Sequence, residues 1–368
     1  GRSVVGMVIG QGECQSSERG RPMKNWGWLL MFVSLMLSAC EHKELCLDHQ
    51  PHTPRVEYLL ALSYDIEWEY NLESHIDWKQ YCDDRYGVSY DDIRPTHPEG
   101  VRLHIYDEDH NTESVRNLGT QGATVHFSDE GHYAVLLHNN DTEYIVYQGM
   151  ETFSTAYATT RGVTRTTYQG NSLMTRADGE EEVTVNPPDM LFGAYIDSIY
   201  VEKSVKPDTL SVTLYPLSFT YLVRYEVEEG AEYMALARGA LAGMARGVNL
   251  GTGQTSADEA TVLFDAQVTD FGAQALVKSF GVPDYPNPNY GRGVQQYGLN
   301  LEVRLTDGSI HQYEFDVTDQ VEKQPHGGVI VVGGIKVEKP APDEGGGGGG
   351  FDVGVEGWGD VIDIPLPL

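Results

Sequence analysis

Apolar and polar residues alternate with a period of two along most of the chain. Val101, Leu103 and Ile105 are separated by polar or amphipathic residues, and similar runs recur from residue 56 onward. Because neighbouring side chains on a strand point to opposite faces, this pattern predicts half-buried β-strands. In the first half of the chain it predicts strands at residues 56–69, 101–106, 123–127, 131–137 and 144–147.

The second half shows the same alternation in longer runs. The turn-forming pair Asp307-Gly308 stands between two such runs and predicts a β-hairpin. Strands are predicted at residues 210–215, 219–227, 299–305 and 310–317.

Three segments depart from the strand pattern. The Ala-rich residues 232–245 predict a helical turn, although their glycines weaken it. Residues 74–86 predict a short helix, and the Pro- and Asn-rich residues 283–293 predict an exposed loop.

These elements predict an all-β protein with two tandem domains. The first domain is expected at residues 56–155 and the second at 185–340. Residues 156–184 are rich in Thr, Arg, Gly and Ser and are interpreted as a linker between the two domains.

The segment near the start of the chain is typical of a bacterial export signal. An apolar run from Trp26 to Leu37 follows Met23-Lys24 and is shorter than the roughly 20 residues that span a bilayer. Residues 23–39 are therefore interpreted as a signal peptide. Its last residues, Leu37, Ser38 and Ala39, form a lipobox before Cys40, whose thiol would take the lipid. The alternative is a buried helix with a chance LSAC sequence, which the polar switch at Glu41 disfavours.

Two segments flank this signal. Residues 1–22 are polar and mixed, and they are expected to be an upstream extension without a part in the fold. Residues 40–55 are polar with two prolines and are interpreted as a tether between the lipid and the first domain.

The C-terminal end combines a glycine linker with a strand-like segment. Residues 341–350 end in an unbroken glycine run, and residues 351–368 then alternate between apolar and polar positions. An unpaired alternating strand is an aggregation hazard, so this segment is expected to fold back on its own sheet or to pair with a neighbour. The apolar positions expected to enter a strand exchange are Phe351, Val353, Val355, Ile362 and Ile364.

Charge narrows the range of partners. The chain has 25 basic and 55 acidic residues, which gives a net charge of −30. A surface of this kind repels nucleic acid and anionic lipid, so neither is an expected partner. Hydrophobic residues make up 40% of the chain, which is too rich for a disordered protein.

The remaining cysteines allow one bridge. Cys14 lies in the upstream extension and Cys40 is the expected lipid acceptor, which leaves Cys46 and Cys82. Outside the cytoplasm an isolated pair of this kind more often forms a disulfide than a metal or redox site.

Metal and cofactor sites are not predicted. His126, His132 and His138 recur every six residues, but no neighbouring Cys or HxxxH motif supports a metal site, so they are interpreted as histidines on sheet faces. Residues 107–110 (DEDH) contain carboxylates that calcium could use, yet they lack the glycine and the final glutamate of an EF-hand. A turn after the strand at 101–106 explains them better.

Catalytic motifs are equally absent from the sequence. It contains no GxSxG, HExxH or Walker motif, so the protein is predicted to be no enzyme, and a hydrolase with paired carboxylates is a minor alternative. Trp68, Trp78 and Tyr285 could stack on sugars if they are exposed, although aromatic residues at strand spacing more often lie in a core.

A series of short segments resembles the fimbrillin-like surface lipoproteins of Bacteroidales, in a branch that carries a domain of unknown function. The segments are the lipobox at 37–40, LYPL at 214–217, LAGMA at 241–245 with GVNL at 247–250, DVTDQV at 316–321, and the glycine run before FDVGVEGWGDVIDIPL. Together they span most of residues 23–368.

This resemblance implies two transthyretin-like, Greek-key β-sandwich domains, lipid attachment in the outer membrane at the cell surface, and assembly into pili by strand addition. In polymerising members a trypsin-like protease removes an N-terminal strand, and Arg55 and Arg176 are the candidate cleavage points, with an ordinary surface arginine as the alternative for each. Expected partners are other fimbrial subunits or further copies of the chain, and a host or bacterial surface receptor. The alternative function is glycan binding by a surface lipoprotein of a polysaccharide-uptake system.

Overall fold

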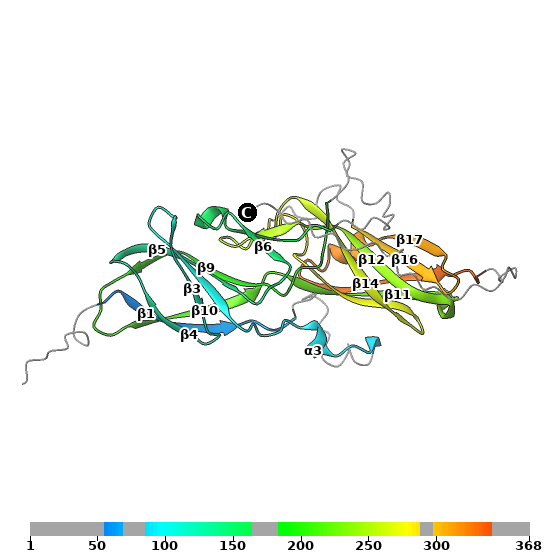
Figure 1. Cartoon of the computed structure of the whole chain (residues 1–368), viewed down its shortest axis with the longest axis horizontal. Coiled ribbons are helices and arrows are strands. Elements are labelled where there is room, and N and C mark those ends of the chain that lie inside the picture. The colour runs from blue at the N-terminus through cyan, green and yellow to red at the C-terminus, as the bar shows by residue number, and fades with distance from the viewer. Residues whose placement is uncertain (1–54, 69–84, 164–182, 288–296, 341–368) are drawn as a thin grey trace, which may run out of the picture. The chain divides into compact units, whose positions relative to one another are not determined.

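The computed structural model describes residues 55–68, 85–163, 183–287 and 297–340. Regular structure in these ranges is almost entirely β-strand (Figure 1), and the all-β prediction is confirmed. The helical elements are short: α3 (Tyr90–Ile93), α4 (Thr318–Val321), and the 3-10 turns η2 (Phe153–Thr155) and η4 (Ala231–Tyr233). No helix in the described ranges has the length and apolarity needed to cross a bilayer.

Seven strands form the first sheet, in the order β3-β2-β5-β9-β10-β1-β4. Its first strand in the chain, β1, lies parallel to its last strand, β10, and antiparallel to β4. The strands are β1 (Glu57–Tyr64), β2 (Val101–Tyr106), β3 (Thr112–Leu118), β4 (Gly122–His126), β5 (Gly131–Asn139), β9 (Phe192–Val201) and β10 (Asp208–Pro216).

Eight strands form the second sheet, in the order β17-β16-β12-β14-β15-β11-β18, with β8 paired to β14. Here too an early strand, β11, lies parallel to the last one, β18. The strands are β8 (Val183–Val185), β11 (Phe219–Glu229), β12 (Met234–Ala245), β14 (Glu259–Thr269), β15 (Gly272–Ser279), β16 (Gly298–Leu305), β17 (Ile310–Asp316) and β18 (Gly328–Lys336).

A third, small sheet covers one face of the first sheet. It consists of β6 (Ile145–Gln148), β7 (Tyr157–Thr160) and β13 (Gly247–Asn249). Strand β13, which follows β12 in the chain, thus pairs with the hairpin formed by β6 and β7. Tyr106 and Leu136 of the first sheet belong to the same buried cluster as Ile145 and Val248 of the small sheet.

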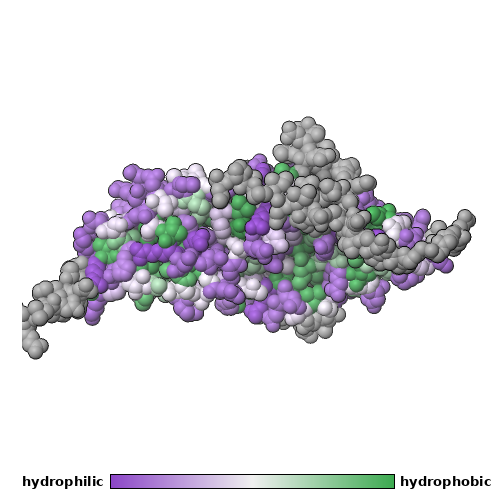
Figure 2. Space-filling view, viewed as in Figure 1, coloured by the Kyte–Doolittle hydropathy of each residue, from purple (hydrophilic) through white to green (hydrophobic). Residues whose placement is uncertain are grey.

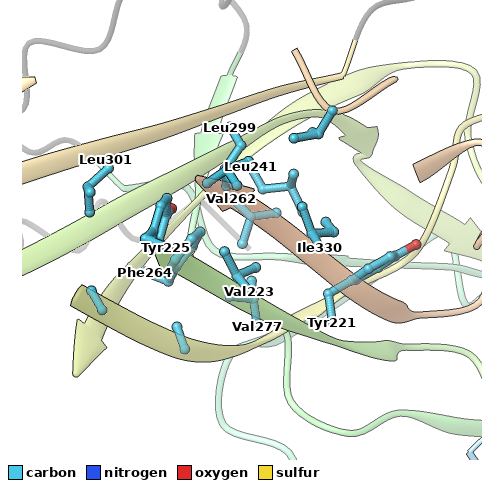
Figure 3. Packing of buried hydrophobic residues seen from close by; sticks show 14 of the residues in the cluster. Tyr221, Val223, Tyr225, Leu241, Val262, Phe264, Val277, Leu299, Leu301 and Ile330 are labelled. Carbon is cyan, nitrogen blue, oxygen red and sulfur yellow. The ribbon is translucent and has the colours of Figure 1, made fainter. Parts of the chain in front are cut away.

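Alternating side chains build the two larger cores. On β2, Val101, Leu103 and Ile105 enter the core of the first sheet, as their spacing predicts. In the second core, Tyr221, Val223 and Tyr225 of β11 pack against side chains of facing strands (Figure 3). The buried hydroxyl of Tyr225 donates to the carbonyl of Asn300 at 2.7 Å, so this polar group is satisfied within an apolar core. On the surface, Figure 2 shows apolar patches broken up by polar side chains over the visible face.

The Ala-rich segment differs from its prediction. A helical turn occupies only Ala231–Tyr233, and β12 takes up the next twelve residues. A Cβ at Gly239 would lie 2.4 Å from the ring of Phe264, so glycine there permits close packing of the aromatic ring on the strand. Tertiary packing therefore overrides the helix propensity of alanine.

Sheet membership also departs from the expected order. The expected linker, 156–184, contains β7 and the start of β8. The strands that follow it, β9 and β10, pair with β5 and β1 of the first sheet, so apart from β8 the strands of the second sheet begin only at β11. The division into two folding domains stays a prediction.

Packing on β12 can be tested by one substitution with an internal control. Leu241 is fully buried in the second core and Leu236, on the same strand, is 46% exposed. We expect Leu241→Ala to lower the free energy of unfolding by about 2–5 kcal/mol, because it leaves a cavity. Leu236→Ala should change it by less than about 0.5 kcal/mol in the same denaturant titration. Equal effects would contradict the strand assignment.

Candidate functional site

Strands β9 and β10 are neighbours in the first sheet but are paired at one end only. Their ladder consists of Tyr215 with Gly193 and Pro216 with Phe192. In contrast, β9 pairs with β5 from Gly193 to Val201, and β10 pairs with β1 from Asp208 to Leu214. Successive residues of a strand direct their main-chain groups to alternate edges. Both strands therefore present main-chain N–H and C=O groups to the gap between them. No ladder within the described residues pairs these groups.

A hollow of about 430 Å³ occupies this gap and is called the β9–β10 groove below. Both strands and two connecting loops contribute to its walls. Its lining residues are Gly193, Ala194, Tyr195, Ile196, Ser211, Val212, Thr213, Tyr215, Leu217, Leu250 and Gly253.

Local features explain why the two strands part. The register of β9 on β5 shifts between Ile196 and Ile199, where β9 carries one residue more than its partner. A bulge of this kind bends a strand and increases its twist. At the closed end, a Cβ at Gly193 would lie 2.4 Å from Cδ1 of Leu217, so that leucine fills the space beside the glycine.

The core beneath the groove is incompletely covered. Ile196, Ile199 and Leu210 pack against the first core but are only half-buried, whereas Leu137 and Phe192 of the same core are fully buried. On the outer side, Tyr195 and Tyr215 are 45% and 55% exposed and flank the opening. The groove therefore offers unpaired main chain and apolar surface together.

The three histidines singled out in the sequence lie in different environments. Nδ1 of His126 is 3.0 Å from a carboxylate oxygen of Glu57, and the ring of His132 is 4.9 Å from that of Tyr200. Only His138 is buried. Among the described residues, no group of three or more His, Cys, Asp or Glu could hold a metal ion.

His138 has a buried partner that the sequence did not point out, His104 on the adjacent strand β2. Their Nε2 atoms are 3.2 Å apart, and Nδ1 of His138 is 2.7 Å from the carbonyl oxygen of Asn139. If His138 donates from Nδ1, its Nε2 accepts the proton of His104 Nε2. This pattern requires His138 to be neutral, and it leaves Nδ1 of His104 without a hydrogen-bond partner.

Burial keeps the pair neutral. It lowers the pKa of His104 to about 4 and the pKa of His138 to about 3, below the usual 6.5. The ring of His138 is also 4.2 Å from that of Tyr147 on β6, so the pair lies where the small sheet covers β2 and β5. The alternation along β2 places His104 on the other face of the strand from Leu103 and Ile105. Only the fold shows that the small sheet buries this second face too.

The segment 107–110 forms a turn, as expected. The amide of Asn111 donates to Oδ1 of Asp107 at 2.9 Å, and the amide of His110 donates to the carbonyl of Asp107 at 2.9 Å. His110 has a φ of +63°, a left-handed conformation suited to a turn.

The two described candidates for sugar stacking, Trp68 and Tyr285, are not exposed platforms. Trp68 is buried against the second sheet, and Tyr285 packs edge-on against His326 with ring centres 4.5 Å apart. Trp78 lies outside the described residues.

Arg55 lies directly before β1. It forms a bridge with Ser204, and a guanidinium nitrogen is 3.3 Å from Glu57. Cleavage after Arg55 would leave β1 between β10 and β4, so it would not open the sheet.

The other predicted site residues lie outside the described ranges. They are the lipobox with Cys40, the cysteines Cys46 and Cys82, the candidate cleavage point Arg176, and the tail positions Phe351, Val353, Val355, Ile362 and Ile364.

The chain matches a known protein family. The profile of DUF5119, a domain of unknown function, matches residues 62–265. The chain belongs to this family. The matched range includes β9 and β10, and therefore the whole ladder that closes the groove.

The chain is also similar to one named protein and to solved structures. A Bacteroides ovatus protein with the provisional name fimbrium anchoring subunit Fim4B is 25% identical over 369 residues, covering 93% of this chain and 98% of the relative. A crystal structure from Bacteroides ovatus, provisionally named an adhesin, shares 22% identity and a TM-score of 0.53 over 80% of this chain and 96% of that chain. The fimbrial anchor protein Mfa2 from Porphyromonas gingivalis has 9% identity and a TM-score of 0.43, covering 75% and 90%. The resemblance to fimbrial proteins of Bacteroidales is confirmed.

The histidine pair makes stability depend on pH. Both pKa values are lower in the folded than in the unfolded protein, so the unfolded state binds protons first as the pH falls. We expect the free energy of unfolding to fall between about pH 6.5 and pH 3, by up to about 1.4 kcal/mol per pH unit for each ring. Denaturant titrations across this range, compared with the double variant His104→Leu/His138→Leu, measure the effect.

The double variant should have a flatter pH profile than the wild type below pH 6.5. The matched control is His126→Leu/His132→Leu, which removes two exposed histidines. If both double variants keep the wild-type slope, the buried pair does not contribute.

Proposed function

We propose that this protein is a non-enzymatic, lipid-anchored fimbrial subunit that accepts an extended strand of a neighbouring subunit in the β9–β10 groove. The observation that carries the proposal is the two-residue ladder between β9 and β10. The provisional names of the relatives, fimbrium anchoring subunit and adhesin, support it.

An extended chain suits the groove better than a compact ligand. Strand addition draws affinity from main-chain hydrogen bonds and specificity from alternate side chains. An inserted strand would meet the unpaired edges of both β9 and β10. Its inward side chains would cover Ile196, Ile199 and Leu210, and its outward side chains would lie between Tyr195 and Tyr215.

The C-terminal segment 351–368 is the proposed donor, because its apolar residues alternate. A neighbour's groove is favoured over the chain's own. Lys336 at the end of β18 lies opposite Glu229, at the end of β11 remote from β10. Eleven residues of β11 span roughly 35 Å. The described chain therefore leaves β18 at an end roughly that far from β10, which favours a neighbour's groove as the acceptor.

Proteolysis is not required in this scheme. The groove is open with β1 in place between β10 and β4, so neither Arg55 nor Arg176 has to be cut before a strand can enter. A subunit of this kind could receive its neighbour directly after export.

Lipid attachment would supply the anchor. Cleavage before Cys40 and acylation of its thiol would hold the protein at the outer membrane, and residues 40–55 would carry the β-sheets away from the lipid. We propose the cell surface as the location, in line with the fimbrial and adhesin names of the relatives.

Glycan binding is the second candidate function. Tyr195, Tyr200 and Tyr215 are exposed on adjacent strands of one sheet, and exposed rings of this kind can stack on sugars. A glycan array without hits, or with hits unchanged by Tyr195→Ala and Tyr215→Ala, would remove this candidate.

Strand addition can be followed by hydrogen exchange along β9 and β10. We expect a synthetic peptide of residues 351–368, added to the protein, to slow hydrogen exchange in residues 194–201 and 208–213, because new main-chain hydrogen bonds form there. Hydrogen–deuterium exchange with mass spectrometry measures this. A control peptide with Asp at positions 353, 355 and 362 should bind at least about tenfold more weakly. Protection on β3 or β18 alone, or none at all, would contradict the proposal.

The anchor can be tested with paired cysteine variants. We expect Cys40→Ser to abolish incorporation of labelled palmitate and to release the protein from the membrane fraction, because the acceptor thiol is lost. Cys46→Ser, six residues further on, should retain both the label and the membrane association. Mass spectrometry that finds the leader uncleaved in the wild type would overturn the lipoprotein assignment.

A further inference from the structure

A second, smaller hollow lies where the chain passes from β10 to β11. Its volume is about 150 Å³, and it is called the crossover hollow here. Four of its lining residues carry aromatic rings, namely Trp68, Tyr215, Phe219 and His326, and two carry carboxylates, Asp65 and Glu67. Pro95, Pro216, Met190, Ser218 and Thr220 complete the lining, and among the described residues no lysine or arginine belongs to it.

The aromatic side chains are held in place by contacts with one another and with the neighbouring backbone. Trp68 is 7% exposed, and its indole Nε1 donates to the carbonyl of Thr220 at 3.0 Å. The rings of Phe219 and His326 stack with centres 4.4 Å apart and 20° between their planes. A Cβ at Gly327 would lie 3.1 Å from Nε1 of Trp68, so the backbone closes tightly behind the indole.

The carboxylates are also positioned. Oδ1 of Asp65 accepts from the amide of Glu67 at 3.1 Å, and the hydroxyl of Tyr90 donates to Oε2 of Glu67 at 2.9 Å. Two negative groups thus stand beside aromatic rings in a chain whose net charge is −30. The field of the protein and the local lining both favour a positively charged ligand.

We infer that the crossover hollow binds a quaternary ammonium group. Aromatic faces attract cations through their quadrupole, and they form the cages that recognise methylated ammonium groups. A primary ammonium would lose its strong hydration among rings, prolines and a methionine, with the carboxylates of Asp65 and Glu67 and hydroxyl groups as the main side-chain acceptors. Methylation weakens that hydration and supplies an apolar surface that matches the lining.

This inference is independent of the fimbrial proposal. The groove is defined by unpaired main chain, whereas the hollow is defined by rings and carboxylates. Tyr215 lines both, so a variant at this position cannot separate them, and the test uses other residues.

Choline and its neutral isostere 3,3-dimethylbutan-1-ol separate cation recognition from simple apolar binding. We expect choline to bind the full chain saturably and the neutral isostere to bind at least about tenfold more weakly. Calorimetry or ligand-observed NMR measures both affinities. Equal affinities, or no saturable choline binding at millimolar concentration, would overturn the inference.

Variants locate the binding. Asp65→Asn should weaken choline binding several-fold and leave any binding of the neutral isostere unchanged, because only the charge is removed. Phe219→Leu should weaken choline binding as well. The control is Asp197→Asn, at an exposed position of β9 outside the hollow, which should bind choline as the wild type does. The assignment would be contradicted if only the control lost choline binding, or if neither Asp65→Asn nor Phe219→Leu did. Unfolding curves check that each variant is folded.

Discussion

The incomplete pairing of β9 with β10 is the constraint on which the proposed function of this protein depends. A buried main-chain group without a partner costs about 1–3 kcal/mol, so facing strand edges ordinarily close on each other. Here they are joined by two residue pairs and then separate. The gap is tolerable because it opens into a hollow that admits solvent. The half-buried Ile196 and Leu210 beneath it add an apolar reason for an extended chain to enter.

The small sheet lies next to this gap. It covers β2 and β5 on the face opposite the first core, through a cluster that includes Tyr106, Phe153 and Leu250. Leu250 also lines the groove, so the segment after β13 provides part of its wall. The histidine pair lies at this same contact between sheets. The segment that covers one face of the first sheet therefore also borders the opening between β9 and β10.

The two hollows beside Tyr215 differ in what they recognise. The groove presents hydrogen-bonding main chain along two strands, which suits a peptide and carries little charge selectivity. The crossover hollow presents rings and carboxylates in a volume of about 150 Å³, which suits a compact cation. A single crossover, from β10 through Pro216 to β11, forms the boundary of both.

Sequence alone determined the element types wherever alternation was strong. The strands at β2, β5 and β11 followed from local spacing, because the facing of side chains on a strand depends only on neighbouring residues. Residues 232–245 were wrongly expected to be a helical turn, since pairing with β14 and β16 outweighs the propensity of alanine. The burial of His104, the pairing of β9 and β10 with the first sheet, and the seam between them were decided only by tertiary structure. Each depends on residues far apart in the chain, and periodicity carries no information about which strands become neighbours.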